Sequence, residues 1–204
     1  EVMDLVKEGK RDPKKVSIIL QGIIENRRDV FPPFFEFRLP PVTSNGMTDK
    51  DWIAQGEIDF SDWAKDIMSK TEFNKSVTNN ITYHPVLIKG DEFSGKERII
   101  KNIRAEAKRR GYITPPPELA PLLRQAISDE DIKALGLTWL AVMHEPIIGF
   151  GGSPSLFGLF WSDVGRWLDA YFGDPDHYWS RDDGFIFLAP QVSKKEVFEY
   201  VKYS

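Results

Sequence analysis

The spacing of apolar residues changes along the chain from a helical period to a strand period. In residues 12–24 the apolar positions recur at i, i+3, i+4, i+7 and i+8, which describes one face of a helix, and Asp12 and Pro13 suit its start. A run of prolines and phenylalanines follows at 31–42, where paired prolines favour extended backbone over a central strand. We therefore predict a helical segment and Pro/Phe-rich linker over residues 1–45, packed on a single α+β domain at 46–204.

Helix signals continue between residues 48 and 136. Thr48 with Asp51 can cap a helix at 49–55, and Ser61 can cap one at 62–69. The side chains predicted to face inward from these two helices are Trp52, Ile53, Trp63 and Ile67. The stretch 96–110 indicates a helix that ends at Gly111, and two more helices are predicted, one near Pro117 and one capped by Ser128 with Asp131 and ending at Gly136.

Strand-like alternation dominates from Leu137 onward. Runs at 138–144, 155–161, 165–172 and 184–190 are joined by short connections, which favours an antiparallel meander. One more strand is indicated at 81–89, where Pro85 suits an edge or a bulge, and a last helix is predicted at 193–202. The predicted fold class is α+β, with N-terminal helices packed on a C-terminal, mainly antiparallel sheet of about four to five strands.

Composition narrows the classes of function. The chain has 204 residues, a net charge of −4 and no cysteine, which excludes a disulfide scaffold, a thiolate zinc site and a cysteine nucleophile. No apolar run reaches the roughly 20 residues of a membrane span, and the N-terminus is charged throughout. We expect a cytoplasmic protein without a membrane partner; the start at Glu1 rather than Met leaves open that an upstream segment was removed.

Four sequence blocks carry a resemblance to other proteins. They are RDPKKVSIILQ (11–21), RRGYITPPPELAPLL (109–123), GLTWLAVMHEPI (136–147) and GRWLDAYFGDPDHYWSRDDGFIFLAPQ (165–191). In this order they resemble an uncharacterised family of bacterial hypothetical proteins. That family has no assigned activity, so the resemblance implies a discrete bacterial module and transfers no functional residues.

Aromatic residues near the C-terminus form the first candidate site. Alternation in RWLDAYF places Trp167, Asp169 and Tyr171 on one strand face, and Leu168, Ala170 and Phe172 on the opposite, core face. The first face suits either a ligand or partner surface or packing beneath helices. The predicted ligand or partner surface consists of Trp161, Arg166, Trp167, Asp169, Tyr171, Tyr178, Trp179 and Arg181.

Acidic residues in the same region form a second candidate site. Its members are Asp163, Asp174, Asp176, His177, Asp182 and Asp183. Such a set could bind a hard cation, provide paired carboxylates as in glycosidases, or simply form solvated turns. Because the spacing fits no recognised ligand loop, we predict neither a metal nor a cofactor.

Three further motifs have structural interpretations. His144-Glu145 lacks the second histidine of H-E-x-x-H and predicts an edge or partly buried histidine. The Gly-rich stretch 149–158 predicts a hairpin connection rather than a phosphate loop. The basic stripe Lys101, Arg104 and Lys108 could be a solvated face, could neutralise phosphates, or could dock on an acidic protein or on the acidic rim near the C-terminus.

These observations favour a non-enzymatic binding or protein-interaction module whose partner is an unknown protein or small ligand. One alternative is an enzyme with a carboxylate or metal site in 163–183. The other is a nucleic-acid-binding regulator that uses the helix at 96–110, which the net negative charge disfavours.

Overall fold

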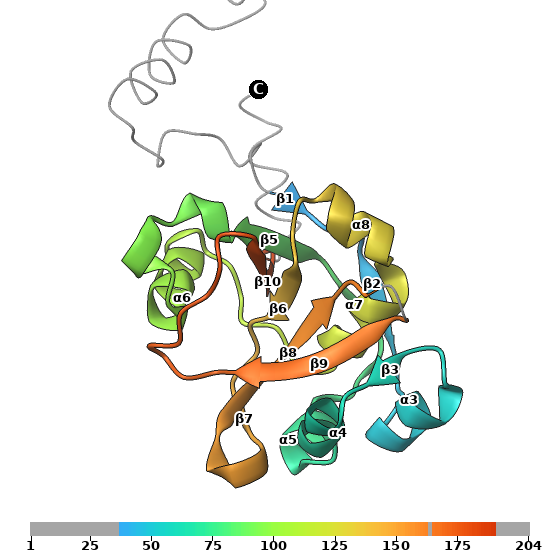
Figure 1. Cartoon of the computed structure of the whole chain (residues 1–204). Coiled ribbons are helices and arrows are strands. Elements are labelled where there is room, and N and C mark those ends of the chain that lie inside the picture. The colour runs from blue at the N-terminus through green and yellow to red at the C-terminus, as the bar shows by residue number, and fades with distance from the viewer. Residues whose placement is uncertain (1–36, 163–164, 191–204) are drawn as a thin grey trace, which may run out of the picture. The chain divides into compact units, whose positions relative to one another are not determined.

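The computed structural model describes residues 37–162 and 165–190. Within these ranges the protein has an α+β fold, in which six α-helices are interleaved with an eight-stranded mixed sheet and a separate two-stranded ribbon (Figure 1). The helices predicted at 12–24 and 193–202 lie outside the described residues. Most of the segment predicted at 1–45 also lies outside the described residues, so the predicted domain boundary near residue 45 stays a prediction.

The described elements have the following bounds. The helices are α3 (Asp49–Gln55), α4 (Asp62–Met68), α5 (Thr71–Ser76), α6 (Ile100–Arg109), α7 (Leu119–Ala126) and α8 (Asp129–Ala134). The large sheet contains β1 (Phe37–Arg38), β3 (Asp59–Phe60), β5 (Pro85–Lys89), β6 (Trp139–Val142), β7 (Ile147–Ile148), β8 (Pro154–Phe160), β9 (Trp167–Phe172) and β10 (Asp183–Leu188). The ribbon consists of β2 (Val42–Asn45) and β4 (Asn79–Tyr83).

The order of strands in the large sheet is β1-β5-β10-β6-β8-β9-β3, with β7 paired to β8 beside this path. Strands β6, β8 and β9 form the predicted antiparallel meander. The last strand does not extend it: β10 lies between β5 and β6, antiparallel to β5 and parallel to β6. A second parallel pair joins β3 to β9. The sheet is therefore mixed.

The predicted division into N-terminal helices and a C-terminal sheet is wrong. Strands β1 to β5 all precede residue 90 and alternate with α3, α4 and α5. These early strands have two to five residues each. Such short runs leave little periodicity, and their pairing depends on strands far away in the sequence.

Helices cover both faces of the large sheet. On one face, which we call the α7 face, a core cluster joins α3, α4, α5, α7 and α8 to inward side chains of the strands. On the other, the α6 face, a second cluster packs Ile100, Ile103 and Ala107 of α6 on the strands. Figure 1 shows α6 on one side of the strands and α7 with α8 on the other.

Local signals placed the helix ends well. Thr48 with Asp51 and Ser128 with Asp131 form capping boxes, and the Ser61 hydroxyl accepts a hydrogen bond from the Ala64 N–H. Of the side chains predicted to face inward, Trp52 and Ile67 are buried and Trp63 is partly buried. The prediction for Ile53 is wrong, because this side chain is exposed.

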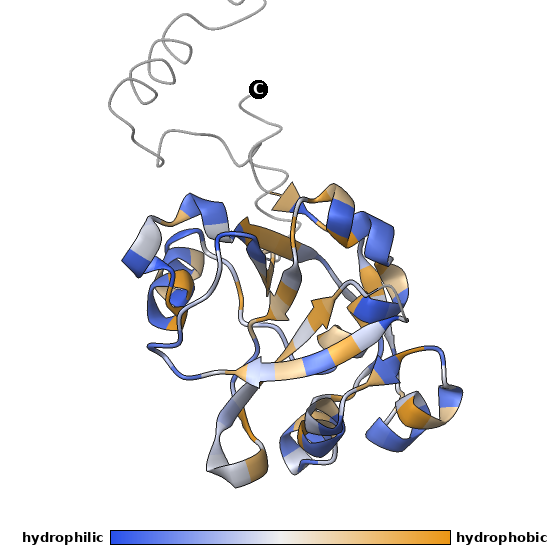
Figure 2. Ribbon diagram, viewed as in Figure 1, coloured by the Kyte–Doolittle hydropathy of each residue, from blue (hydrophilic) through white to orange (hydrophobic). Residues whose placement is uncertain are grey.

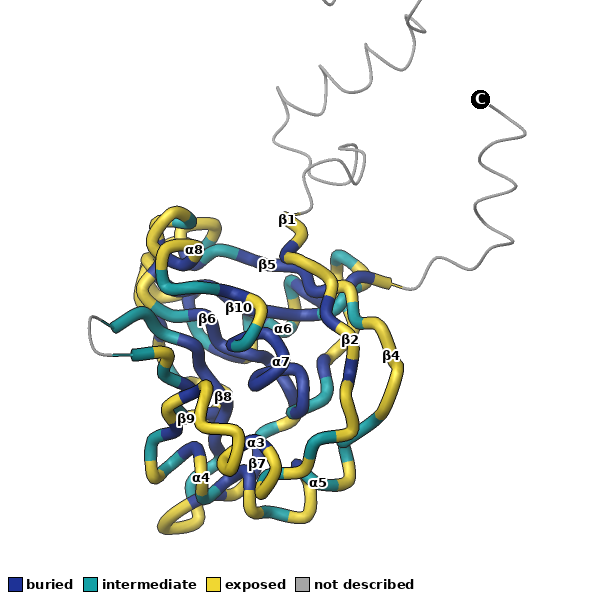
Figure 3. The backbone as a smooth tube through the Cα atoms, turned by 90° about the vertical axis from the view of Figure 1, so that its right-hand side faces the viewer, coloured by how far each residue is buried: buried dark blue, intermediate teal, exposed yellow. Residues whose placement is uncertain are grey.

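Two predicted elements have different bounds in the structure, because contacts with distant parts of the chain determine where they begin and end. The helix predicted at 96–110 begins only at Ile100, where the N–H groups of Ile100 and Lys101 donate to the carbonyls of His177 and Pro175. The strand predicted at 81–89 is split at His84. Its first part, β4, is exposed along most of its length (Figure 3), whereas β5 is buried inside the large sheet.

Candidate functional site

One row of side chains across five strands places three aromatic residues between two carboxylates. Trp139 pairs with Phe160, and Phe160 pairs with Trp167, in the antiparallel ladders. Asp183 pairs with Trp139, and Asp59 pairs with Trp167, in the two parallel ladders. Paired residues on neighbouring strands project from the same face of a sheet. We call these five residues the acid–aromatic row; it lies on the α6 face.

The three rings of the row are in contact and half-buried. The ring centroids of Trp139 and Phe160 are 4.7 Å apart, and those of Phe160 and Trp167 are 6.5 Å apart, with an interplanar angle of 27° in both pairs. The Trp139 ring lies over Gly158, where an added Cβ would come within 2.8 Å of a ring atom. These contacts fix the orientation of the rings.

Carboxylates surround the rings. Asp59 is exposed at one end of the row, and its N–H donates to the Arg166 carbonyl over 2.7 Å. Asp183, at the other end, is 5% exposed; burial raises its pKa to about 6, although its Oδ2 accepts a hydrogen bond from the Ser180 N–H. Asp169 lies two residues after Trp167 on the same face, and its Oδ1 accepts from the Ser61 hydroxyl and the Ala170 N–H. The surroundings of the rings are therefore negative.

Farther along the same face the aromatic residues enter the core. Tyr171 is half-buried and lies 5.5 Å from Trp139 and 5.2 Å from Trp179, measured between ring centroids. Trp179, predicted as a surface residue, is only 3% exposed and packs on Phe185 in the α6-face core. The predicted face of Trp167, Asp169 and Tyr171 thus exists, and all three of its side chains are half-buried; Figure 2 shows the alternating hydropathy along β9.

The prediction that Phe172 faces the core is wrong. It is 41% exposed, and its ring meets the Trp63 ring edge-on at 5.0 Å. Phe172 is the last residue of β9, at the end of the strand.

The remaining residues of the predicted aromatic surface lie apart from the row. The Trp161 ring stacks with Lys133 of α8, whose Nζ lies 4.2 Å from the ring centroid. Arg166 donates to the Gln125 carbonyl of α7. Tyr178 and Arg181 are exposed, and the Tyr178 hydroxyl accepts a hydrogen bond from Arg98. Sequence proximity to Trp167 did not bring these side chains together.

The predicted acidic site is dispersed. Asp163 lies outside the described residues, while Asp174, Asp176 and Asp182 are exposed. Asp176 forms an ion pair over 2.7 Å with Lys101, one residue of the basic stripe. His177 is half-buried among aromatic rings, and burial lowers its pKa. No three His, Asp or Glu side chains of the described ranges are placed to hold a metal ion.

His144 has a structural role in the core, where its ring lies beside that of Phe157. It is fully buried; its Nδ1 lies 2.7 Å from the Glu145 carbonyl, and its Nε2 accepts the Phe157 N–H over 3.0 Å. Burial lowers its pKa to about 4, so the ring is neutral at pH 7. Arg104 of α6 donates to the carbonyls of Met143 and His144. Both ring nitrogens of His144 are thus engaged, and Nε2 ties the segment after β6 to β8.

Two other buried ionic side chains also hold elements together. Arg124 of α7 is fully buried and donates to the carbonyls of Trp167 and Ile127 and to Asp129. Glu118 accepts hydrogen bonds from the Thr78 hydroxyl and the Tyr83 hydroxyl, which attaches the ribbon to the start of α7. Burial and this carboxylate raise the pKa of Tyr83 to about 12.

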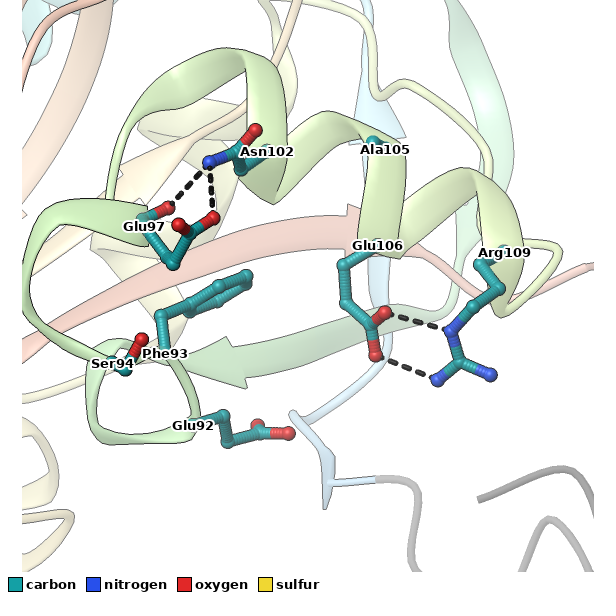
Figure 4. Close-up of a pocket in the computed structure, with 8 residues that line it drawn as sticks. All are labelled: Glu92, Phe93, Ser94, Glu97, Asn102, Ala105, Glu106 and Arg109. Atoms are coloured by element: carbon teal, nitrogen blue, oxygen red, sulfur yellow. Dashed lines mark hydrogen bonds and ion pairs between the residues drawn. The ribbon is translucent and has the colours of Figure 1, made fainter. Parts of the chain in front are cut away.

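Two shallow pockets occur elsewhere on the described surface. One of about 430 Å³ lies beside α6, and Figure 4 shows its polar side chains bonded to each other: Glu106 to Arg109, and Glu97 to Asn102. Ion pairs with Arg109 and Arg110 lower the pKa of Glu106 to about 2. The other pocket, of about 450 Å³, lies around Tyr83 and His84. Neither contains a residue of the acid–aromatic row.

The chain matches no family model, no curated protein and no solved structure. Within the described ranges, no helix combines the length and apolarity that a membrane crossing needs.

Sequence reasoning missed three members of the row as site residues: Trp139, Phe160 and Asp59. The alternation in 138–144 and 155–161 indicates which residues share a strand face, but it does not indicate which strands are neighbours. Asp59 belongs to a two-residue strand that pairs in parallel with β9, and no local sequence pattern indicates this pairing.

Proposed function

We propose that this protein is a non-enzymatic binding module that engages a partner protein through the acid–aromatic row. The observation that carries the proposal is the burial gradient on the α6 face. Next to the row, the strand side chains of Ala141 and Phe185 are fully buried, and so is Leu156 farther along β8, whereas all three rings of the row are half-buried. Aromatic residues at the centre of an accessible patch are typical of the anchors of protein interfaces.

The dimensions of the row suit a segment of protein chain. Five adjacent strands span four spacings of about 4.8 Å, or roughly 19 Å. An extended peptide rises about 3.3 Å per residue, so about six residues would cover the row from Asp59 to Asp183. The contacts between the rings also limit the side-chain entropy that binding would cost.

The two alternative functions have less support. Catalysis would require titratable side chains that converge on an accessible point, and the buried groups His144, Arg124 and Glu118 are engaged in bonds that hold elements together. Nucleic-acid binding would require the stripe on α6 to be available. Arg104, at the centre of this stripe, donates to two carbonyls of the body.

Photo-crosslinking followed by direct binding tests the proposal. A photoreactive phenylalanine analogue at position 160 should capture a partner in cells of the source organism. The captured protein, once purified, should bind the wild-type protein, and Phe160→Ala and Trp167→Ala should each weaken Kd by about tenfold or more, as expected for anchor residues. Phe150→Ala is the matched control, because Phe150 is 61% exposed at the tip of the β7–β8 hairpin.

The proposal fails if no crosslinked protein binds directly, or if Phe160→Ala and Phe150→Ala change Kd equally. Circular dichroism and thermal melting of each variant separate loss of binding from loss of folding. Should Phe160→Ala unfold, Phe160→Leu retains an apolar side chain at the same place and takes its role in the comparison.

A further inference from the structure

The acid–aromatic row combines two features that together favour a cation. Aromatic faces attract Lys and Arg side chains through the ring quadrupole, most strongly when the cation is partly desolvated. Carboxylates at both ends of the row, and Asp169 beside it, add a negative potential over the same rings. The chain as a whole carries a net charge of −4, which reinforces this potential at long range.

Among the described residues, the basic side chains near the row are bonded to other groups or lie on other parts of the surface. The charge of Arg98 acts to lower the pKa of Asp183, but its guanidinium donates to the carbonyls of Gly90 and Trp179 and to the Tyr178 hydroxyl. Arg124 is fully buried, and one Arg166 N–H group is bonded to the Gln125 carbonyl on the α7 face. Arg181 is exposed on the turn that leads into β10. No position of the row or of the adjacent row in β10, β6, β8 and β9 holds Lys or Arg.

Within the described ranges, the protein uses this chemistry at two places in its own fold. Lys133 lies 4.2 Å from the centroid of the Trp161 ring, and the Arg98 guanidinium lies 5.6 Å from that of Tyr178. Both of these rings are occupied by a cation of the chain. The rings of Trp139, Phe160 and Trp167 contact other aromatic rings instead.

We propose that the occupant of the acid–aromatic row is a basic segment of the partner protein, which places an Arg or Lys side chain on the rings between Asp59 and Asp183. This inference rests on the proposed function and names the chemistry of the partner. An extended segment crossing the row would present alternate side chains to the sheet. Its cations would then be drawn toward the exposed Asp59 end and toward Asp169.

The test uses the full-length protein with its tryptophan indole nitrogens labelled with ¹⁵N. The probe is a heptapeptide of alternating glycine and arginine, and the control peptides carry glutamine or glutamate in place of arginine. Single Trp→Phe variants assign the indole signals. The arginine peptide should shift the signals of Trp139 and Trp167 and leave that of the buried Trp52 in place. Raising the salt concentration from 50 to 300 mM should weaken its Kd several-fold, because the carboxylate attraction is screened.

Matched variants separate the contributions of charge and of the aromatic ring. Asp59→Asn should weaken Kd for the arginine peptide by about threefold to tenfold, which is the range of about 0.7 to 1.4 kcal/mol for a partly exposed charge pair. Glu72→Gln, which removes an exposed charge on α5 at the opposite face, should leave it unchanged. Phe160→Leu should also weaken binding, since it keeps an apolar side chain but removes a ring.

The outcomes distinguish the two proposals. Equal shifts with the arginine and glutamine peptides, or no shift with the arginine peptide, overturn the basic segment as occupant. If Phe160→Ala still loses the crosslinked partner in that case, the binding module stands and its partner is not basic. If neither the peptide nor the partner responds to changes in the row, both proposals are wrong.

Discussion

His144 and Asp183 are buried titratable side chains whose contributions to stability change with pH in opposite directions. The pKa of His144 is lowered to about 4 in the folded protein, from about 6.5 in the unfolded chain. The stability that the fold gains from neutral, buried His144 is fully present above pH 6.5 and is lost as pH falls toward 4. The pKa of Asp183 is raised from about 3.8 to about 6, so ionised Asp183 destabilises the fold above pH 6 and this cost disappears as pH falls toward 3.8.

We predict that Asp183→Asn stabilises the protein at pH 7. The amide oxygen can still accept the Ser180 N–H, but no charge has to be buried. The free energy of unfolding from urea titration should rise by about 1–3 kcal/mol at pH 7, and the difference from wild type should vanish near pH 4. Asp182→Asn, at the exposed neighbouring position, should stabilise the protein much less at pH 7, because burial and not the Asp182 charge is the main cause of the raised pKa of Asp183. A variant less stable than wild type at pH 7 would show that ionised Asp183 stabilises the fold through Arg98.

At the scale of elements, the contact between β6 and β8 depends on the absence of a side chain at position 158. The Trp139 ring occupies the space above Gly158, and an added Cβ would lie 2.8 Å from one ring carbon and 2.9 Å from the next. Real Cβ atoms do not approach so closely, and the ring cannot move without disturbing Phe160, which stacks on it.

Gly158→Ala should therefore destabilise the protein by about 1–3 kcal/mol and weaken binding at the row. Gly95→Ala is the control, because nothing lies within 4 Å of the Cβ it would add. Thermal melting measures the first effect, and near-ultraviolet circular dichroism reports the displaced tryptophan. Equal melting temperatures for the two variants would mean that the Trp139 ring has another accessible position.

The elements that sequence patterns predict are those whose signals are local. Ser128 and Asp131 bond to each other's backbone across a single turn, so the start of α8 follows from four residues. The strands β6, β8 and β9 follow from alternation and short connections. The start of α6 does not, because it is fixed by carbonyls about 75 residues later in the chain, those of Pro175 and His177. The candidate site follows only in part for the same reason: Trp167 and Asp169 share a strand, but Asp59 joins them through tertiary pairing.

At the scale of the whole molecule, charge is distributed so that α6 is attached to the body by its own basic face. Arg104 caps two carbonyls, Lys101 pairs with Asp176, and Arg110 pairs with Glu92 and Glu106. These contacts occupy most of the groups that a phosphate backbone would need, and the protein is net acidic.

We predict no appreciable affinity for DNA or RNA at physiological salt. Fluorescence polarisation with a labelled random oligonucleotide should show no micromolar binding, and the variant with Gln at positions 101, 104 and 108 should behave as wild type does. Tight binding that this variant loses would revive the nucleic-acid hypothesis, and the slope of log Kd against log salt would count the phosphates that are contacted.

The place of β10 in the sheet has a consequence for biosynthesis. Its residues 183–188 fill the gap between β5 and β6, which are complete about 100 and 40 residues earlier in the chain. Until β10 leaves the ribosome, both of these buried strands have an unsatisfied edge, and such edges promote pairing between chains. A nascent or truncated chain that ends before residue 183 is thus at risk of aggregation, and insertion of this late strand between its two neighbours must complete the fold.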